Sequence, residues 1–360
     1  MKNLDEQHNR NLSTVVRSNH LPHAGSVIKM NQEKDTNPSL LLKAKVLLAL
    51  NGILGFSILF NLCILFNIFP QSRFYALTSY MLIRLLLPCG SFGCEHKDGA
   101  PWRYFSENLV PFGAILRSYL KFSFKLPPKE FVEQEVLPNA QFVFAVFPHG
   151  CGAEYRIVMD GVMQNIMPNI IAKNNLRTLA ASVLFYIPII RELSLWTSCI
   201  NASRGTAENA LDNGRSLVVL PGGEIEQIMT EFGKEKVYLS KRKGFIKLAM
   251  RKDVSVVPMY VFGCSDYFVT SNFLFGLRYK LVKSLGVCIP ICFGLLGSMC
   301  PLPKTTTIVT GKPLKFEMAG SDPTAQELDD AHALFTKELI ALFDEHKASL
   351  SYGDRKLEVM

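Results

Sequence analysis

One histidine in this sequence has the type and position expected of a group that moves a proton. His149 lies between a proline and a glycine at the end of the apolar run 141–147, and it is the only histidine between His96 and His332. An imidazole titrates near neutral pH, so it can exchange protons with a reacting hydroxyl. We therefore predict a catalytic role for His149; the alternative is a turn histidine that only caps or packs.

Carboxylates near two glycine-rich turns could assist that imidazole. Glu154 follows His149 by five residues, about one helical turn, so its side chain could reach back to the ring. Glu224 and Glu226 follow a second turn, Pro221-Gly222-Gly223, and offer another source of negative charge. For Glu226 the alternative is a carboxylate that answers a helix dipole.

A basic cluster follows the second turn. Six of the 12 residues from Lys241 to Lys252 are Lys or Arg. On a helix, Lys243, Lys247 and Arg251 share one face because they are four residues apart. This face could hold the phosphates of a ligand or lie on lipid headgroups. A merely solvated face is the alternative.

The elements that position these residues follow from apolar periodicity. Four runs rich in apolar residues predict buried strands, at 141–147, 216–220, 254–262, which a proline interrupts, and, more weakly, 305–310. Helical patterns alternate with them, at 204–211, 245–250 and from a Thr324-x-x-Glu327 capping box to about Lys347. The alternation predicts an α/β domain with a mainly parallel sheet and flanking helices. Ligands bind such sheets beyond the carboxyl ends of the strands, where both glycine-rich turns lie.

A long apolar segment precedes this domain. Residues 46–69 run for 24 positions without a charge, enough at 1.5 Å per residue to cross about 30 Å of hydrocarbon. Residues 74–87 are apolar again, but they are fewer and include Arg84. We predict a helical hairpin that enters the bilayer and returns, with a single span as the alternative. The excess of Lys and Arg before Val46 predicts a cytosolic amino terminus, and a hairpin keeps the remaining chain on the same side.

The predicted organisation has four parts. They are a disordered basic arm at 1–45, the membrane hairpin at 46–90, a catalytic domain at 91–350 and a tail at 351–360. Within the catalytic domain, residues 285–299 are apolar but contain proline and glycine, which predicts an interfacial or re-entrant element or a buried loop.

Composition excludes several classes of protein. Charged residues make up 19% of the chain, mean hydropathy is +0.17 and the net charge is +8, which together favour a membrane surface over nucleic acid. The sequence has no G-x-S-x-G elbow, phosphate-binding loop or dinucleotide fingerprint. Nine cysteines, an odd number, favour reduced thiols, and the Cys89, Cys94 and His96 cluster lacks a fourth ligand, so we expect no metal.

Three ordered blocks resemble the type 2 diacylglycerol acyltransferase family, which includes monoacylglycerol and wax-alcohol acyltransferases. The family's H-P-H-G block is similar to residues 147–150, with Phe147 in place of the first histidine. Its G-G-x-x-E block is similar to residues 222–226. Its R-x-G-F-x-K-x-A block and the V-P-x-x-x-F-G block that follows are similar to residues 242–263, with Asp253 where the family tends to have glycine.

The resemblance implies an activity and a set of roles. It implies a glycerolipid-acyltransferase-like fold and transfer of an acyl group from acyl-CoA to diacylglycerol, with His149 as general base and no other cofactor. Glu226 or Glu154 would orient the imidazole, and the choice between them stays open. Backbone N–H groups at Gly150, Gly222 and Gly223 would stabilise the oxyanion. The residues implied for acyl-CoA or headgroup binding are Arg242, Lys243, Lys247 and Arg204.

The resemblance also implies a location and leaves alternatives. We expect the endoplasmic reticulum membrane, with the catalytic domain facing the cytosol, and lipid droplets as a second location. The bilayer is an expected partner, nucleic acid is not, and a homo-oligomer is left open. Alternative acceptors are monoacylglycerol, a long-chain alcohol or a lysophospholipid. A different class of function would be a non-catalytic membrane scaffold.

Overall fold

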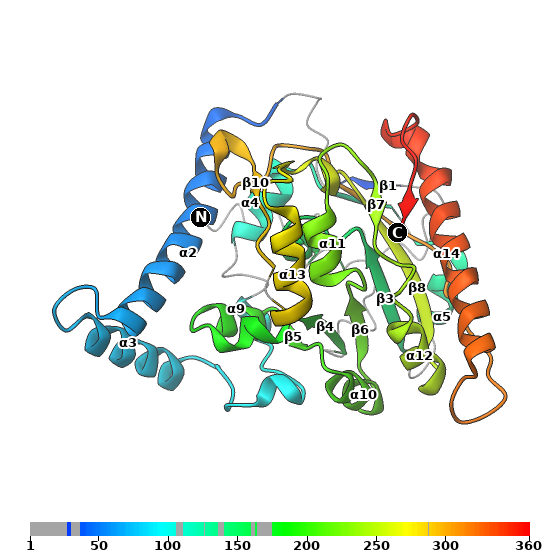
Figure 1. Ribbon diagram of the computed structural model, residues 1–360, viewed down its shortest axis with the longest axis horizontal. Helices are drawn as coiled ribbons and strands as arrows, with labels where there is room; N and C mark the ends of the chain where they lie inside the picture. The colour runs from blue at the N-terminus through cyan, green and yellow to red at the C-terminus, as the bar shows by residue number, and fades with distance from the viewer. Residues whose placement is uncertain are drawn as a thin grey trace, which may run out of the picture.

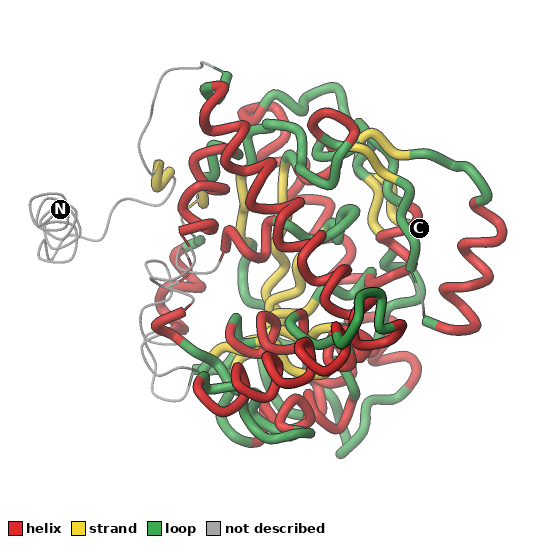
Figure 2. The backbone as a smooth tube through the Cα atoms, turned by 90° about the vertical axis from the view of Figure 1, so that its left-hand side faces the viewer, coloured by secondary structure: helices red, strands yellow, loops and turns green. Residues whose placement is uncertain are grey.

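The computed structural model describes residues 27–29, 37–105, 111–125, 127–135, 140–159, 163, 175–286 and 288–360. Its centre is an eight-stranded sheet with helices on both faces (Figures 1 and 2). In sheet order the strands are β1 (Val27–Lys29), β2 (Ser123–Lys125), β11 (Thr307–Thr310), β8 (Ser255–Phe262), β3 (Phe142–Phe147), β6 (Ser216–Val219), β4 (Leu176–Ala180) and β5 (Cys199–Asn201). Strands β8, β3, β6, β4 and β5 run parallel to one another, which confirms the predicted α/β class with a mainly parallel sheet.

The central strand β3 is buried on both faces because its side chains alternate between two apolar cores. Val143, Ala145 and Phe147 face a core that the helices α10 (Arg204–Asp212), α12 (Gly244–Arg251) and α14 (Ala325–Lys347) complete. The alternate residues face a second core, built with the helices α4 (Pro111–Tyr119), α5 (Lys129–Glu135) and α6 (Tyr155–Met159). The continuous apolar run therefore reflects two cores rather than one.

Most of the predicted elements lie where the patterns placed them. The four apolar runs correspond to β3, β6, β8 and β11, and the three helical patterns correspond to α10, α12 and α14. The Thr324 capping box is present, with Thr324 Oγ1 accepting from the Glu327 N–H at 3.2 Å. Strands β2, β4 and β5 had no distinct signal, because each is short and includes a strongly polar residue, Lys125, Arg177 or Asn201.

Two apolar helices stand at one side of the domain (Figure 1). Helix α2 (Leu40–Phe66) is the one helix among the described residues that is long and apolar enough to cross a membrane. It starts six residues before the predicted Val46, because Ser39 Oγ accepts from the Leu42 N–H at 3.2 Å and so caps the helix at that point. Helix α3 (Ser72–Leu86) follows after a turn and packs against it.

The predicted arm and tail need correction at their ends. Residues 1–26 and 30–36 lie outside the described residues, but 27–29 form β1 at the sheet edge and 40–45 belong to α2. Residues 351–360 are not a separate tail, because β12 (Glu358–Val359) pairs with β7 (Lys236–Val237). The apolar segment 285–299, predicted as an interfacial or re-entrant element or a buried loop, contains β10 (Cys292–Phe293), which pairs with β9 (Val269–Thr270), and a short 3-10 turn.

Three further helices and one 3-10 turn lie around the site and the hairpin. They are α9 (Ile190–Trp196), α11 (Gly223–Met229) and α13 (Phe275–Leu285), together with the 3-10 turn η4 (Cys264–Asp266).

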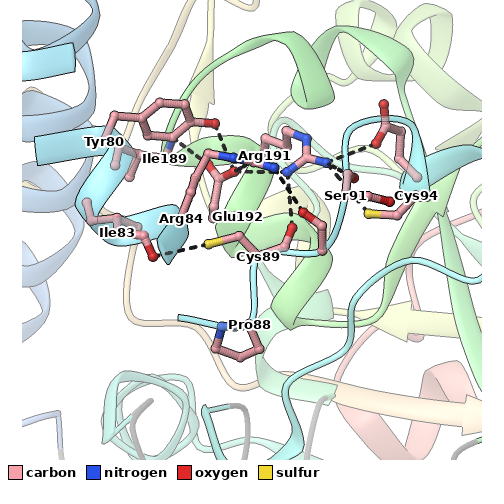
Figure 3. Close-up of polar contacts among 12 residues, drawn as sticks. Tyr80, Ile83, Arg84, Pro88, Cys89, Ser91, Cys94, Ile189, Arg191 and Glu192 are labelled. Carbon is pink, nitrogen blue, oxygen red and sulfur yellow. Dashed lines mark hydrogen bonds and ion pairs between the residues drawn. The ribbon is translucent and has the colours of Figure 1, made fainter. Parts of the chain in front are cut away.

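A buried polar network joins α3 to α9 (Figure 3). Glu192 Oε1 accepts hydrogen bonds from the Tyr80 hydroxyl (2.9 Å), Arg84 Nη1 (3.1 Å) and Arg191 Nη1 (3.0 Å). Nη2 of Arg191 donates to Glu95 Oε2 at 3.2 Å. Two arginines thus meet two glutamates, so the network is balanced in charge, and Arg84 faces the protein rather than lipid. This pairing explains how a charge is accommodated in an apolar helix.

Candidate active site

The turn after β3 presents His149 at the carboxyl end of the sheet. Phe147, the last strand residue, is fully buried and its ring lies 6.2 Å from that of Phe335. Gly150 has a φ of +67°, and a Cβ there would collide with Cys264 Sγ. Glycine is therefore required at 150 both for the backbone conformation and for the close approach of η4. Phe147, which stands where the similar family has its first histidine, therefore packs in the core, and His149 supplies the imidazole of this turn.

The backbone of the same turn orients the imidazole. His149 is half-buried, and its Nδ1 lies 3.1 Å from Gly150 O. A ring that donates from Nδ1 to this carbonyl presents Nε2 as a proton acceptor. Burial lowers the pKa of His149 below its ordinary value of 6.5, so the ring is neutral at neutral pH. This arrangement suits a general base.

Glu226 holds the backbone of His149 rather than its ring. One carboxylate oxygen accepts the His149 N–H, and the other accepts the Tyr238 N–H at 2.6 Å. A Cβ at Gly222 would collide with this carboxylate, so the first glycine of that turn makes room for it. Burial raises the pKa of Glu226 to about 7, against the opposing effect of the two N–H donors and the Arg242 charge. Both oxygens are used on the main chain, so the carboxylate fixes the turn and not the tautomer.

Glu154 interacts within its own turn. Its side chain folds back over Gly152, where a Cβ would collide with it, and its Oε2 is buried without a hydrogen-bond partner in the described residues. Burial raises the pKa of Glu154 to about 7, although the N–H groups of Gly152 and Glu154 itself lower it. Burial lowers the pKa of His149, and the carboxylate whose charge partly offsets that lowering is Glu224 rather than Glu154. Glu224 was predicted only as a general source of negative charge.

The N–H groups predicted to stabilise the oxyanion differ in the hydrogen bonds that they already make within the protein. The Gly223 N–H donates to Leu220 O at 3.1 Å, which closes the turn into α11. It could reach an oxyanion only if that turn opened. Gly150 and Gly222 remain predicted donors.

The predicted phosphate-binding residues separate into two groups. Arg242 adjoins the second glycine-rich turn, since its Nη2 donates to Gly222 O at 2.9 Å and its guanidinium lies 5.2 Å from the centre of the Tyr238 ring. The two lysines pair away from this turn, Lys243 with Asp329 and Lys247 with Asp322 at 3.2 Å.

Arg204 is largely exposed and pairs with Glu208 at 2.8 Å on the first turns of α10. Of the four residues, only Arg242 is therefore placed beside the His149 region by the structure.

Two contacts that hold the His149 turn could not be predicted from the sequence. Tyr238 reaches Glu226 through its main-chain N–H, and Cys264 supports Gly150 through close packing. Neither contact depends on a characteristic side chain at a characteristic spacing, so no sequence pattern could have indicated them.

Cys89 and Cys94, which precede His96 in the sequence, both contact Arg191. Cys94 Sγ lies 3.6 Å from Arg191 Nη2, and the Cys89 carbonyl accepts from Arg191 Nη1 at 3.2 Å. Within the described part of the chain, no group of three or more His, Cys, Asp or Glu side chains is arranged to hold a metal ion.

The two buried glutamates predict that stability falls as pH rises. Burial raises the pKa of Glu226 and of Glu154 from the ordinary value of 4.5 to about 7. The folded state therefore binds these protons more tightly than the unfolded chain, so the stabilisation is full below about pH 4.5 and is lost by about pH 7. Each shift corresponds to at most about 3 kcal/mol. We expect the melting temperature of the purified chain in detergent to fall between about pH 5 and about pH 8.

Substitution identifies the source of that pH dependence. Glu226→Gln and Glu154→Gln should each reduce the fall in melting temperature. Glu133→Gln, which alters an exposed helical ion pair with Lys129, is the matched control and should leave the fall unchanged. Equal pH dependence in all four proteins would contradict the assignment of these two carboxyls.

Comparison with known proteins places the described site in a known family. A family model described as diacylglycerol acyltransferase matches residues 114–360, which include both glycine-rich turns. Diacylglycerol O-acyltransferase 1 of Eremothecium gossypii is 30% identical over 241 residues, which cover 63% of this chain and 51% of that protein. This chain therefore spans about half the length of that relative.

Two human proteins are similar over comparable regions. Diacylglycerol O-acyltransferase 2 of Homo sapiens is 29% identical over 283 residues, 73% of this chain and 66% of that protein. The human 2-acylglycerol O-acyltransferase 3 is 30% identical over 242 residues, 62% of this chain and 69% of that protein. The relatives' names thus include two kinds of acyl acceptor.

Proposed function

We propose, because this chain belongs to the diacylglycerol acyltransferase family, that it transfers a fatty acyl group from acyl-CoA to the free hydroxyl of diacylglycerol, giving triacylglycerol. The observation that carries the proposal is the His149 turn, where one ring nitrogen is fixed by Gly150 O and the other is left to accept a proton. Acyl-CoA is a substrate in this reaction, and we propose no further cofactor. The same membership leads us to propose a glycerolipid-acyltransferase-like fold.

The reaction needs a base because a neutral alcohol attacks a thioester slowly. His149 Nε2 takes the hydroxyl proton as the alcohol oxygen bonds to the thioester carbon. The resulting oxyanion would be stabilised by the N–H groups of Gly150 and Gly222. When the intermediate collapses, the carbon–sulfur bond breaks and the imidazolium returns its proton to the sulfur of CoA. The products are the new ester and free CoA thiol.

Two side chains beside His149 have supporting roles in this proposal. Glu226 holds the His149 main chain, so the ring is placed before substrate binds. Arg242, which donates to Gly222 O on the second glycine-rich turn, is our candidate for a CoA phosphate. Lys243 and Lys247, which are paired with acids, are weaker candidates.

We propose that the chain works at the endoplasmic reticulum membrane with its catalytic domain in the cytosol, and that it also reaches lipid droplets. Helix α2 would lie in the bilayer, where its exposed apolar side chains favour lipid. Helix α3 has 15 residues, about 22 Å at 1.5 Å per residue, which is short of a full crossing. A hairpin that returns to the side of entry is therefore the arrangement that we favour.

A second apolar surface supports contact with the same bilayer. Eight large apolar side chains of the described segment from β9 to the turn after β10 are exposed: Val269, Phe273, Leu274, Leu277, Ile289, Phe293, Leu296 and Met299. The segment lies beside the N-terminal half of α2 (Figure 1), and its Leu295 packs in the same cluster as Val46. The chain has no acidic residue between Asp266 and Glu317 but has six basic ones, which suits anionic headgroups.

Photocrosslinking can test this second membrane contact. We expect a photoreactive residue at Leu277 or Leu296 to label phospholipid in vesicles that contain the full chain, since both side chains would reach the headgroup region. Leu334 on α14 is exposed to a comparable extent and is the control, for which labelling at least about fivefold weaker is expected. Equal labelling at the three positions would contradict the proposed surface.

An acceptor panel tests the activity itself. The purified chain is incubated with labelled acyl-CoA and, in turn, diacylglycerol, monoacylglycerol, a long-chain alcohol and a lysophospholipid. The highest kcat/KM is expected with diacylglycerol. Monoacylglycerol is the second candidate, because one relative is named a 2-acylglycerol O-acyltransferase. A higher value with another acceptor would overturn the substrate, and no turnover with any acceptor would favour a membrane scaffold.

A further inference from the structure

The last residues of the chain are built into the catalytic domain. The Glu358 N–H donates to Glu235 O at 2.8 Å and the Met360 N–H to Val237 O at 2.9 Å, which pairs β12 with β7. In return, Met360 O accepts from the N–H groups of Leu239 and Ser240 at 3.0 and 2.9 Å. The chain on both sides of Tyr238 is therefore fixed by main-chain hydrogen bonds to this C-terminal strand.

Arg355, just before that strand, joins two buried acids. Its Nη1 donates to Glu235 Oε1 at 2.7 Å and its Nη2 to Asp266 Oδ1 at 3.0 Å. Glu235 also accepts from the hydroxyls of Tyr260 (2.6 Å) and Ser265 (2.7 Å). Glu235 and Asp266 are 1% and 5% exposed, so both carboxylates depend on protein donors rather than water.

One of these acids leads to the His149 main chain. Glu235 lies directly before β7, and Tyr238 lies directly after it. The Tyr238 N–H donates to Glu226, whose other oxygen accepts the His149 N–H. A shift of β7 would therefore move the carboxylate that holds His149.

The second acid leads to the other side of the same turn. Asp266 ends η4, and Cys264 begins it. Cys264 Sγ lies so close to Gly150 that a Cβ would not fit there, and it is 4.0 Å from Pro148 O. Arg355 thus connects the two elements that enclose the His149 turn, one through Glu226 and one through Cys264.

We propose that Arg355, together with β12, is a positioning element that holds the His149 turn in its active geometry. Arg355 acts through Glu235 and Asp266 and does not touch the reacting atoms. The proposal rests on the proposed function of His149, and it assigns a role to a segment that the sequence indicated only as a tail.

Substitution of Arg355 tests the proposal in the full-length chain. Displacements of about 1 Å at a reacting group can cost about 100-fold, so we expect Arg355→Gln to lower kcat by about 10- to 100-fold, with KM for acyl-CoA within about twofold. Arg355→Lys, which keeps the charge, should recover most of that loss. Lys356→Gln removes the same charge from the exposed neighbour and is the matched control, with unchanged kinetics expected. Glu226→Gln breaks the same path at its centre and sets the scale of a full loss.

A second substitution reaches the same element by a different route. Glu358→Pro removes the N–H that donates to Glu235 O and leaves Arg355 in place, so a similar fall in kcat is expected. All assays are run below the melting temperature of each variant. A kcat within about twofold of wild type for folded Arg355→Gln, or no recovery in Arg355→Lys, would overturn the proposal.

A readout without turnover separates this proposal from the proposed function. Diethyl pyrocarbonate modifies neutral imidazoles, and mass spectrometry follows each histidine. We expect His149 to react at least about threefold faster in Arg355→Gln than in wild type because the turn loosens, while exposed His96 reacts at the same rate. An unchanged His149 rate overturns the positioning role. An inactive wild type with an increased His149 rate in the variant overturns only the proposed function.

Discussion

Replacing His149 with alanine should lower kcat by about 10²- to 10⁴-fold, the usual contribution of a general base. Among the described residues, the ring is the imidazole that follows the central strand β3 at its carboxyl end, and Gly150 O fixes its Nδ1 so that Nε2 can take the hydroxyl proton. Its pKa is lowered by burial, so the neutral base is already present at neutral pH. KM for acyl-CoA should change little, because no contact of the imidazole is needed to hold the CoA portion. Initial rates with labelled acyl-CoA and diacylglycerol measure the effect.

The His149 experiment has two internal controls. His149→Ala should remain bound to membranes and should melt near the wild-type temperature, since the ring is half-buried and its hydrogen bond to Gly150 O lies within the turn. His96→Ala removes an exposed histidine outside the site and should keep full activity. Activity of folded His149→Ala within about tenfold of wild type would rule out the base assignment.

Replacing Glu192 with alanine should destabilise the protein by about 3–5 kcal/mol, because it leaves buried charges without their partner. Glu192 is 1% exposed and accepts from Tyr80, Arg84 and Arg191 (Figure 3). Arg191 keeps Glu95, but Arg84 loses its only carboxylate among the described contacts. The loss should appear as a lower melting temperature in detergent.

Matched variants distinguish a buried network from a general effect of removing a charge. Glu133→Ala breaks an exposed helical pair and should cost at most about 0.5 kcal/mol. The double variant Arg84→Leu with Glu192→Leu should cost less than the sum of the two single changes, because the two side chains interact directly. A loss below about 1 kcal/mol in Glu192→Ala would mean that the network does not hold α3 against α9.

The contacts between α3 and α9 also connect the proposed membrane anchor to the catalytic domain. Asn61, near the C-terminal end of α2, donates to Pro188 O at 3.2 Å, two residues before α9 begins. Both hairpin helices therefore contact the segment around α9. With α2 in the bilayer as proposed above, a domain held in this way would present its sheet at a fixed distance from the membrane.

The sequence by itself determined most of the central elements and singled out His149 as the candidate base. Strands β3, β6, β8 and β11 were predictable because a buried parallel strand must be apolar on both faces, and turns that end such strands need glycine or proline. His149 was predictable because few side chains titrate near neutral pH and only one lies at such a turn. The apolar helix α2 was predictable because the 24 residues from 46 to 69 run without a charge, which marks one long apolar helix.

Only the tertiary structure decided what each polar group touches. Glu226 was one of two carboxylates expected at the imidazole, but both its oxygens accept main-chain N–H groups, one from a residue 77 positions away in the chain. Lys243 and Lys247 were expected at a phosphate, but they pair with Asp329 and Asp322. Arg355 was part of a predicted tail, but it joins two buried acids behind the His149 turn. The periodicity of apolar residues indicates which face of a helix or strand is buried. Almost every residue, however, has the same main-chain N–H donor. Only the folded structure therefore shows which of these donors a given carboxylate contacts.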